Sequence, residues 1–309
     1  MLFFFTKTCH SNLFIINLWG EDNTYCFIQY FEPMTRFLIL HFFLLVFIAF
    51  ASAQDDLFYN PIDHGIGRNG AVTLHPWSHF SNPSGIAGVS EITAGIGYHR
   101  SFEVKEFDSK TILCVVPTKL IVAGAGYSYF GFEYFNIQRV NLSAARSIAP
   151  WLNMGIRFNY ITHRQIEAEA NQIITFDAGL QFVPAEKVRI GFYAVNPAST
   201  KWNLPDWDEY QNVFVAAAIA YEPARNISLE AGILKNSKYP AELSFSLEVP
   251  LYEQIVIRGN VATEPLRLGL GAGFKWKAFM FDAGFGYHSA LGISSSFGLL
   301  VSMGTLFNN

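Results

Sequence analysis

The sequence predicts an all-β protein: an antiparallel transmembrane β-barrel of about fourteen strands with an N-terminal plug-like segment. The first observation is alternation. From 152 to 160, Leu, Met, Ile, Phe and Tyr alternate with Asn, Gly, Arg and Asn. Successive side chains of a strand point to opposite faces, so one face is apolar and the other polar. The polar face is sparse and rich in Gly, Ser and Asn, which favours a barrel with lipid outside and a polar lumen.

Composition is the second observation. Charged residues make up 15% of the chain and hydrophobic residues 51%, whereas a soluble domain carries about 25% charged residues. After residue 53 no apolar run reaches the length of about 20 residues that a membrane helix needs. A closed barrel is the other structure that satisfies the backbone in lipid. The net charge of −4 argues against nucleic acid as a partner, since that would favour a basic surface.

A secretory signal peptide is predicted at residues 34–53. Met34-Thr35-Arg36 supplies a basic start, Phe37–Phe50 is apolar apart from one His, and Ala51-Ser52-Ala53 is a small-residue cleavage site. These parts define an export signal, so we expect a barrel in the cell outer membrane. Because residues 1–33 precede this signal, we expect Met34 to be the true start and 1–33 to be an N-terminal extension from upstream sequence.

Residues 54–89 differ from the rest of the exported chain. Their many glycines and prolines and their lack of sustained alternation indicate turns and short helical pieces. Apolar side chains such as Val72, Trp77 and Phe80 favour burial. The lumen or periplasmic mouth of the barrel, predicted at 90–309, is the nearest shelter, so we expect a plug or a periplasmic segment.

Metal and cofactor sites are not predicted. His75 and His79 stand four residues apart and could share a helix face. However, Pro76 separates them and no Cys or carboxylate accompanies them. Cys114 is the only cysteine after residue 53, which excludes an internal disulfide framework. We assign no metal, no cofactor and no catalytic residue.

About fourteen alternating segments are the expected strands. They cover 91–100, 109–116, 120–129, 136–147, 152–163, 173–182, 188–195, 212–222, 227–235, 241–249, 255–263, 266–274, 279–287 and 294–303. Connections after even-numbered strands are tight, and most others are longer, the longest being Asn196–Gln211. Outer-membrane barrels have short periplasmic turns and long extracellular loops, so both termini of the barrel are expected in the periplasm.

Aromatic residues gather at the expected strand ends. Tyr98, Tyr127, Tyr129, Tyr160, Tyr193 and Tyr287 lie at the outer ends, and Trp151, Tyr252 and Trp276 lie at the periplasmic turns. Aromatic rings favour the headgroup level of a membrane. Two outward-facing aromatic girdles are therefore expected.

Eight charged residues are candidate lumen charges: Arg157, Asp177, Arg189, Glu230, Glu248, Arg258, Arg267 and Asp282. Inward ion pairs and hydrogen-bond networks would stabilise the barrel without chemistry. Alternatively, these carboxylates with His163 or His288 could serve an outer-membrane hydrolase. Such catalysis needs a nucleophile, a base and an orienting group within reach, and no motif links them here.

The longest outer loop contains Trp202, Trp207 and Tyr210. Trp and Tyr often dominate the binding energy of protein interfaces. The loop is therefore a candidate contact surface for secreted proteins or other envelope subunits. A self-packed lid over the barrel mouth explains the same composition.

The N-terminal segment also carries a family resemblance. Gly67–Val72 and Trp77–Ala87, with the turn Asn82, Pro83, Ser84 and Gly85, resemble the opening of the PorV and PorQ barrels of the type IX secretion system. More distantly, they resemble long-chain fatty-acid transporters. Ser84 and Ile86 stand where that group has Ala and Leu. The resemblance implies a fourteen-stranded barrel in the lipid of a Bacteroidota-type outer membrane.

Three functions compete at this point. The resemblance implies a secretion-associated barrel or one that contacts other envelope proteins. The N-terminal segment instead favours a gated channel for hydrophobic or small solutes, similar to the fatty-acid transporters. A hydrolase or a purely structural barrel is the third class.

Overall fold

The computed structural model describes residues 60–67, 69–166, 170–203, 208–210, 213–224, 227–237, 240–263 and 265–304. The expected extension at 1–33 and the expected signal peptide at 34–53 lie outside these residues.

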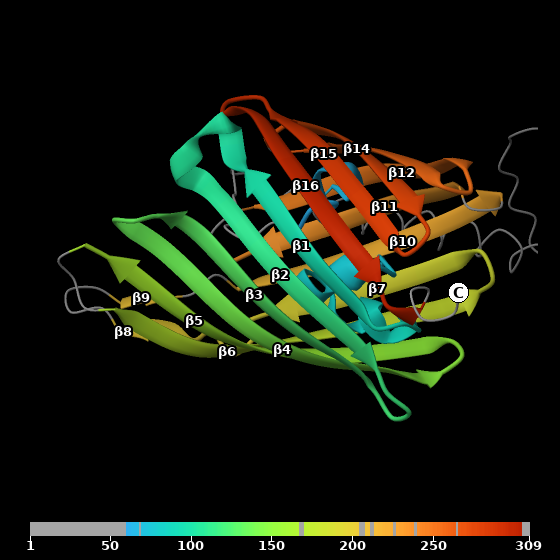
Figure 1. Cartoon of the computed structure of the whole chain (residues 1–309), viewed down its shortest axis with the longest axis horizontal. Coiled ribbons are helices and arrows are strands. Elements are labelled where there is room, and N and C mark those ends of the chain that lie inside the picture. Colours follow the sequence, from blue (N-terminus) through green and yellow to red (C-terminus); the bar gives the residue numbers. More distant parts are fainter. Residues whose placement is uncertain are drawn as a thin grey trace, which may run out of the picture. The chain divides into compact units, whose positions relative to one another are not determined.

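Fourteen antiparallel strands close into a barrel, which confirms the predicted fold class (Figure 1). Each strand pairs with the next barrel strand in the chain, and Thr93 of the first lies opposite Ser302 of the last to close the ring. The strands are β1 Thr93–Arg100, β2 Asp108–Pro117, β3 Val122–Phe132, β4 Phe135–Ala149, β5 Leu152–Gln165, β6 Asn171–Ala185, β7 Val188–Val195, β10 Phe214–Ala224, β11 Ile227–Asn236, β12 Ala241–Tyr252, β13 Ile255–Ala262, β14 Arg267–Trp276, β15 Phe279–His288 and β16 Gly292–Ser302.

Several strands, among them β6, β10 and β12, continue past the ends that alternation predicts. The expected ends at 182, 222 and 249 are extended to Ala185 in β6, Ala224 in β10 and Tyr252 in β12. The register shifts in each extension, between Phe182 and Ala185, between Tyr221 and Ala224, and between Pro250 and Tyr252. A proline, which has no N–H to donate, lies at each shift. Pro184 and Pro223 have no partner in the ladder, whereas Pro250 stays opposite Val256 and the next residue, Leu251, is left out. Alternation therefore stops at the proline although the strand does not.

The longest connection contains a hairpin that the sequence did not predict. β8 (Lys201–Asn203) pairs with β9 (Asp208–Tyr210) in a separate two-stranded sheet between β7 and β10. Trp202 and Tyr210 lie on these strands, and Trp207 lies outside the described residues. The contact role of this loop stays a prediction.

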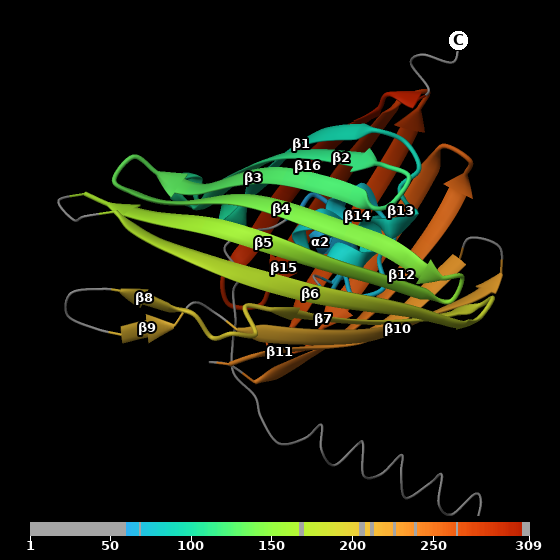
Figure 2. The ribbon, with the colours of Figure 1, turned by 90° about the horizontal axis from the view of Figure 1, so that it is seen from below.

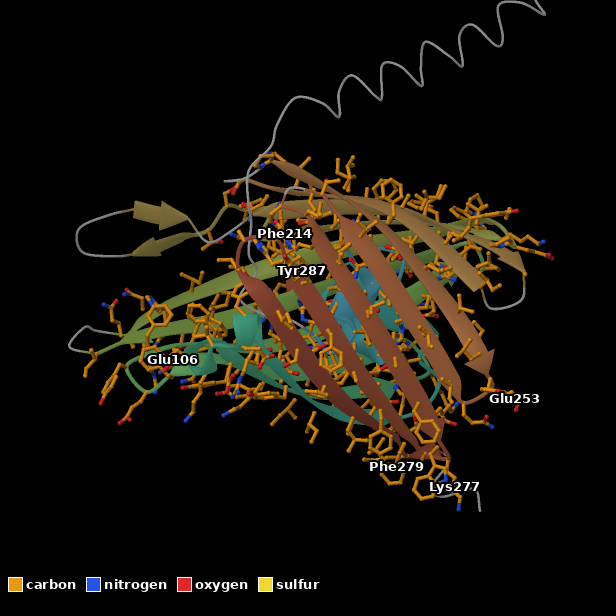
Figure 3. All side chains as sticks on the ribbon, turned by 90° about the horizontal axis from the view of Figure 1, so that it is seen from above. Glu106, Phe214, Glu253, Lys277, Phe279 and Tyr287 are labelled. Carbon is orange, nitrogen blue, oxygen red and sulfur yellow. The ribbon has the colours of Figure 1, made fainter. Side chains whose placement is uncertain are left out.

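The outer face of the barrel is apolar. On β5, Met154, Ile156 and Phe158 point outward, and Phe158 is 55% exposed, whereas Arg157 faces the lumen and is 1% exposed. Figure 3 shows side chains projecting from the wall around the barrel. An exposed apolar surface of this extent is typical of the lipid-facing wall of a transmembrane barrel. In the part of the chain that the structure describes, no helix is both long and apolar enough to cross a membrane.

Aromatic side chains occupy both ends of the outer face. Trp151, Tyr252 and Trp276 are exposed at the short turns, and Tyr160 and Tyr287 are exposed toward the opposite strand ends. Tyr287 is labelled in Figure 3. The prediction is wrong for one tyrosine. Tyr193 is buried and packs in the lumen on Ala71 and Val72, because the neighbouring Phe192 takes the outward position on β7. Tyr193 thus belongs to the plug contact and not to a girdle.

The N-terminal segment lies inside the barrel (Figure 2). It forms α2 (Asp63–Ile66), η1 (Pro76–Phe80) and η2 (Pro83–Gly88). Trp77 and Ile86 are fully buried, and they form an apolar core with Leu113, Val115 and Leu300 of the wall. Two further short helices, η3 (Ser101–Glu103) and η4 (Lys105–Phe107), lie in the connection between β1 and β2. Below, residues 60–89 are called the plug.

Candidate functional site: the plugged lumen

Asn82 holds the turn of the plug against the barrel wall. Its side-chain oxygen accepts hydrogen bonds from the Ser84 N–H at 3.1 Å and the Ser84 hydroxyl at 2.8 Å, which caps η2. Its amide nitrogen donates to the Ala71 carbonyl at 2.6 Å. Pro83 follows at the first position of η2, where its missing N–H costs nothing. The motif singled out in the sequence is therefore a buried structural joint of the plug.

Glycines make room for this joint on both sides. A Cβ on Gly155 of β5 would lie 2.5 Å from the Pro83 backbone, and one on Gly179 of β6 would collide with the Asn82 side-chain oxygen. Within the plug, a Cβ on Gly85 would lie 2.6 Å from the Ser78 side chain. Real Cβ atoms do not approach other heavy atoms so closely, so these glycines let the plug backbone touch the wall.

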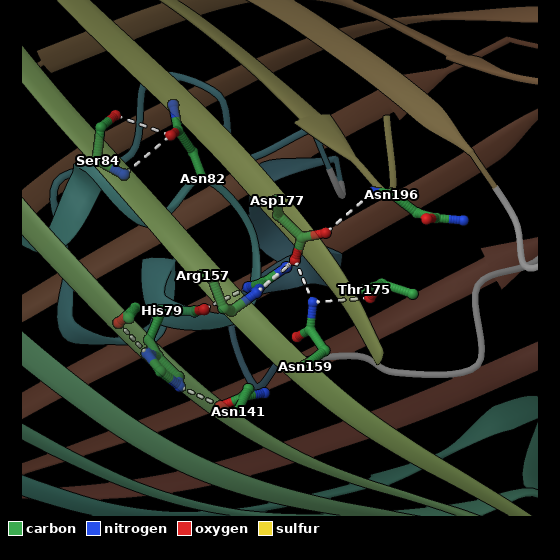
Figure 4. Close-up of polar contacts among 10 residues, drawn as sticks. His79, Asn82, Ser84, Asn141, Arg157, Asn159, Thr175, Asp177 and Asn196 are labelled. Carbon is green, nitrogen blue, oxygen red and sulfur yellow. Dashed lines mark hydrogen bonds and ion pairs between the residues drawn. The ribbon is translucent and has the colours of Figure 1, made fainter. Parts of the chain in front are cut away.

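A buried ion pair fastens the plug to β5 and β6 (Figure 4). The guanidinium of Arg157 lies 2.7 Å from Asp177, and the two side chains are 1% and 0% exposed. Asn159 donates to Asp177 at 2.8 Å and the Asn196 N–H donates to it at 3.0 Å. Arg157 also donates to the carbonyl of His79 in the plug. A buried pair is tolerated only when its remaining donors and acceptors are satisfied, and here a plug carbonyl supplies one of them.

His79 is enclosed by polar side chains of β4. Its Nδ1 lies 2.7 Å from the Ser143 hydroxyl, and its Nε2 hydrogen-bonds the Asn141 side-chain oxygen. Since that oxygen only accepts, Nε2 carries the proton and Nδ1 accepts from Ser143. Burial, reinforced by the charge of Arg157, lowers the pKa of His79 to about 3. The imidazole is therefore neutral at physiological pH.

A second buried cluster ties the plug to the opposite wall. The indole N–H of Trp77 donates to Asp282 of β15 at 3.2 Å. Arg258 of β13 bridges Asp282 at 3.0 Å and Glu248 of β12 at 2.7 Å. Nearby, the side-chain amide of Asn260 donates to the carbonyl of His64 in α2. The plug is thus bonded to two separate arcs of the barrel.

Two further candidate lumen charges, Arg189 and Arg267, form ion pairs with other glutamates of the wall. Arg189 pairs with Glu222 at 2.7 Å and donates to the Val72 carbonyl of the plug at 2.8 Å. Arg267 pairs with Glu242 at 3.1 Å. Sequence reasoning named both arginines but missed Glu222 and Glu242, because these lie near strand ends where alternation gives little guidance. It also missed Asn141 and Asn159, although the inward side of the alternation contained them.

His75 and His79 are not arranged as a metal-binding pair. His79 is held by β4, whereas Nδ1 of His75 accepts the Trp77 N–H at 3.3 Å and caps η1. Among the described residues, no group of three His, Cys, Asp or Glu side chains could hold a metal ion. His288, considered above for a hydrolase, accepts the N–H groups of Ala290 and Leu291, each at 3.1 Å.

A chamber of about 430 Å³ remains between the plug and the wall. Its plug side is formed by residues such as Ile62, Val72 and His75, and its wall side extends from β7 across β10–β15 and includes the turn at Glu253. Glu230 and Glu248 line it as well. The loop lengths predict that this turn faces the periplasm, and on that orientation the chamber would lie on the periplasmic side of the plug.

The fold and the lumen define the class: a transmembrane β-barrel whose own N-terminal segment lies in its lumen. No protein-family profile matches the sequence. A comparison with curated proteins also found no match.

Solved structures do match. The toluene transporter TbuX of Ralstonia pickettii superimposes with a TM-score of 0.60 at 11% identity, over 79% of this chain and 97% of that chain. The monoaromatic hydrocarbon channel CymD gives 0.63 at 12% identity, over 81% and 99%. A Pseudomonas aeruginosa FadL homologue gives 0.53 at 11%, over 82% and 98%. These likenesses show that the chain has the barrel fold of such transport channels, and at these identities they show the fold alone.

Proposed function

We propose that the chain is an outer-membrane channel for small hydrophobic solutes, gated by residues 60–89. The observation that carries the proposal is the bonding of the plug. It is attached by discrete ion pairs and hydrogen bonds, through His79 to Arg157 and through Trp77 to Asp282. Polar attachments in a lumen can be exchanged for water when the plug shifts, whereas the lipid-facing wall stays intact.

The similar solved structures support the same function. Their names describe channels for toluene and other monoaromatic hydrocarbons. The secretion-associated role implied by the PorV/PorQ resemblance has less support, because these matches are transport channels. A hydrolase has less support for the same reason. In addition, the His288 imidazole accepts a hydrogen bond from the N–H of Ala290 in the adjacent turn. Export through the predicted signal at 34–53 to the outer membrane, with lipid around the barrel, is part of this proposal.

Uptake by proteoliposomes tests the proposal. Vesicles containing the full chain should take up radiolabelled toluene faster than vesicles that contain a heat-denatured sample, and should exclude a sugar of similar mass. Uptake of the sugar at the same rate would indicate a general pore. No difference between the two toluene samples would overturn the proposed function.

A further inference from the structure

The chamber between the plug and the wall contains a carboxylate with an unused oxygen. Glu230 on β11 lies between Ala220 of β10 and Ser246 of β12 in the ladder. Its Oε1 is buried and has no hydrogen-bond partner among the described residues. A buried acceptor without a donor is costly, so this oxygen is a position where a donor from a bound molecule would be stabilised.

The nearby cations are already engaged. Arg189 bonds Glu222 at 2.7 Å and Val72 at 2.8 Å. Arg258 bonds Glu248 at 2.7 Å and Asp282 at 3.0 Å. Both arginines line the chamber with Glu230, yet neither supplies a bond to its Oε1.

His75 offers the complementary group from the plug side. Its Nδ1 accepts the Trp77 N–H at 3.3 Å, which places the proton of the neutral ring on Nε2. That Nε2 is buried and, like Glu230 Oε1, lacks a partner within the described residues. Burial lowers the pKa of His75, so the ring is neutral and presents one N–H donor.

Two residues that line the chamber thus each have one buried polar atom without a partner among the described residues: an acceptor on Glu230 and a donor on His75. Ile62, Val72 and Met280 contribute apolar lining. Its volume of about 430 Å³ falls in the range of small-molecule sites, about 300–1,000 Å³. A hydroxyl group can donate, as the Glu230 oxygen requires, and can also accept, as the His75 N–H requires, whereas a hydrocarbon can do neither.

We propose that this chamber binds a small apolar molecule that carries a hydroxyl group, such as a phenol or an alcohol. The inference rests on the proposed function in that it names the solute class of the channel, but binding in the chamber is measured without transport. A cationic amine would use only the acceptor and would leave the His75 N–H unpaired, so it fits less well. Water alone would fill the space without preference for any solute.

Isothermal titration of the purified full chain with three matched probes tests this. p-Cresol should bind about tenfold or more tightly than p-xylene, which has a methyl group in place of the hydroxyl, because a solute without a hydroxyl leaves a buried acceptor and a buried donor unsatisfied, and that costs about this factor. Benzylamine, a cation at neutral pH, should bind more weakly than p-cresol. Equal affinity for p-cresol and p-xylene, no binding of p-cresol, or tighter binding of benzylamine would each overturn the proposal.

Variants locate the site. Glu230→Leu should reduce p-cresol affinity to the level of p-xylene and leave p-xylene unchanged. Glu230→Gln keeps an acceptor and should stay within about threefold of the parent for p-cresol. Glu186→Leu, in the exposed turn between β6 and β7, is the control and should change neither. Unchanged p-cresol binding in Glu230→Leu would overturn the assignment. If that variant does not fold, Glu230→Gln and the three probes on the parent chain still decide.

The outcomes separate this inference from the proposed function. Toluene uptake without any preference for p-cresol would overturn the hydroxyl site alone. Selective p-cresol binding without uptake of toluene or p-cresol by proteoliposomes would overturn the channel alone.

Discussion

Arg157 and Asp177 form a fully buried ion pair, 2.7 Å apart, across the β5–β6 ladder, and the same guanidinium holds the carbonyl of His79 in the plug. The pair therefore stabilises two things together: the register of the wall and the position of the plug. Loss of this ion pair should release the plug from the wall before the barrel itself unfolds, because the backbone hydrogen bonds between β5 and β6 remain.

The first prediction follows from that pair. Asp177→Asn leaves the Arg157 charge buried without a counter-ion, so we expect a loss of about 3–5 kcal/mol in the free energy of unfolding, measured by urea titration in lipid vesicles. Asp108→Asn, in the more exposed Arg100–Asp108 pair, should cost clearly less. Equal losses in the two variants would contradict the special role of the buried pair.

The second prediction concerns the contact between glycine and plug. Gly179→Ala places a Cβ against the Asn82 side chain, so the turn of the plug must move. We expect lower stability and more frequent channel openings in planar bilayers. Gly259→Ala is the matched control, since its nearest neighbour there would be a Leu270 methyl at 3.8 Å. Identical recordings from both variants would show that Gly179 does not position the plug.

The third prediction concerns the lipid face. Phe158→Arg should cost about 2–4 kcal/mol of folding free energy, because its side chain points outward from the middle of β5, whereas Phe281→Arg, at the third residue of β15, should cost less. Leu251→Arg, at a short turn near the interface, should cost about 0–1 kcal/mol. Urea-induced unfolding in vesicles measures the three values. A cost at Leu251 as large as at Phe158 would contradict the assigned membrane position.

The fourth prediction concerns pH. The pKa of His79 falls from 6.5 in the unfolded chain to about 3 in the folded chain, so between these values the unfolded state binds more protons. Stability must therefore fall as the pH decreases below 6.5, by up to about 1.4 kcal/mol per pH unit. Unfolding free energies at pH 7 and pH 5 should show this loss, and His79→Gln should reduce it. An unchanged pH dependence in His79→Gln would exclude His79 as its source.

Alternation predicted most of the barrel because each strand has one face toward lipid and one toward the lumen. On β5, residues 152–160 specify both faces and the strand without help from the rest of the chain. The plug contacts were beyond such reasoning. Trp77 and Asp282 are 205 residues apart, and nothing local marks them as partners.

The local sequence pattern was also a poor guide at lumen positions that contact the plug. Tyr193 was predicted in a girdle, but it packs on Val72. Alternation shows only that Gly155 faces the lumen, whereas in the structure the backbone of Pro83 lies against it. Both outcomes depend on what fills the lumen, which the sequence of each strand does not encode.

Single-channel conductance in planar bilayers tests most directly whether the N-terminal segment closes the lumen. The full exported chain should show low conductance, and a variant lacking residues 54–81 should show a higher one, because η1 and the apolar core around Trp77 are then absent from the lumen. Circular dichroism must first show that the variant keeps the strand content of the parent. A correctly folded variant that conducts no more than the parent would contradict a gating plug.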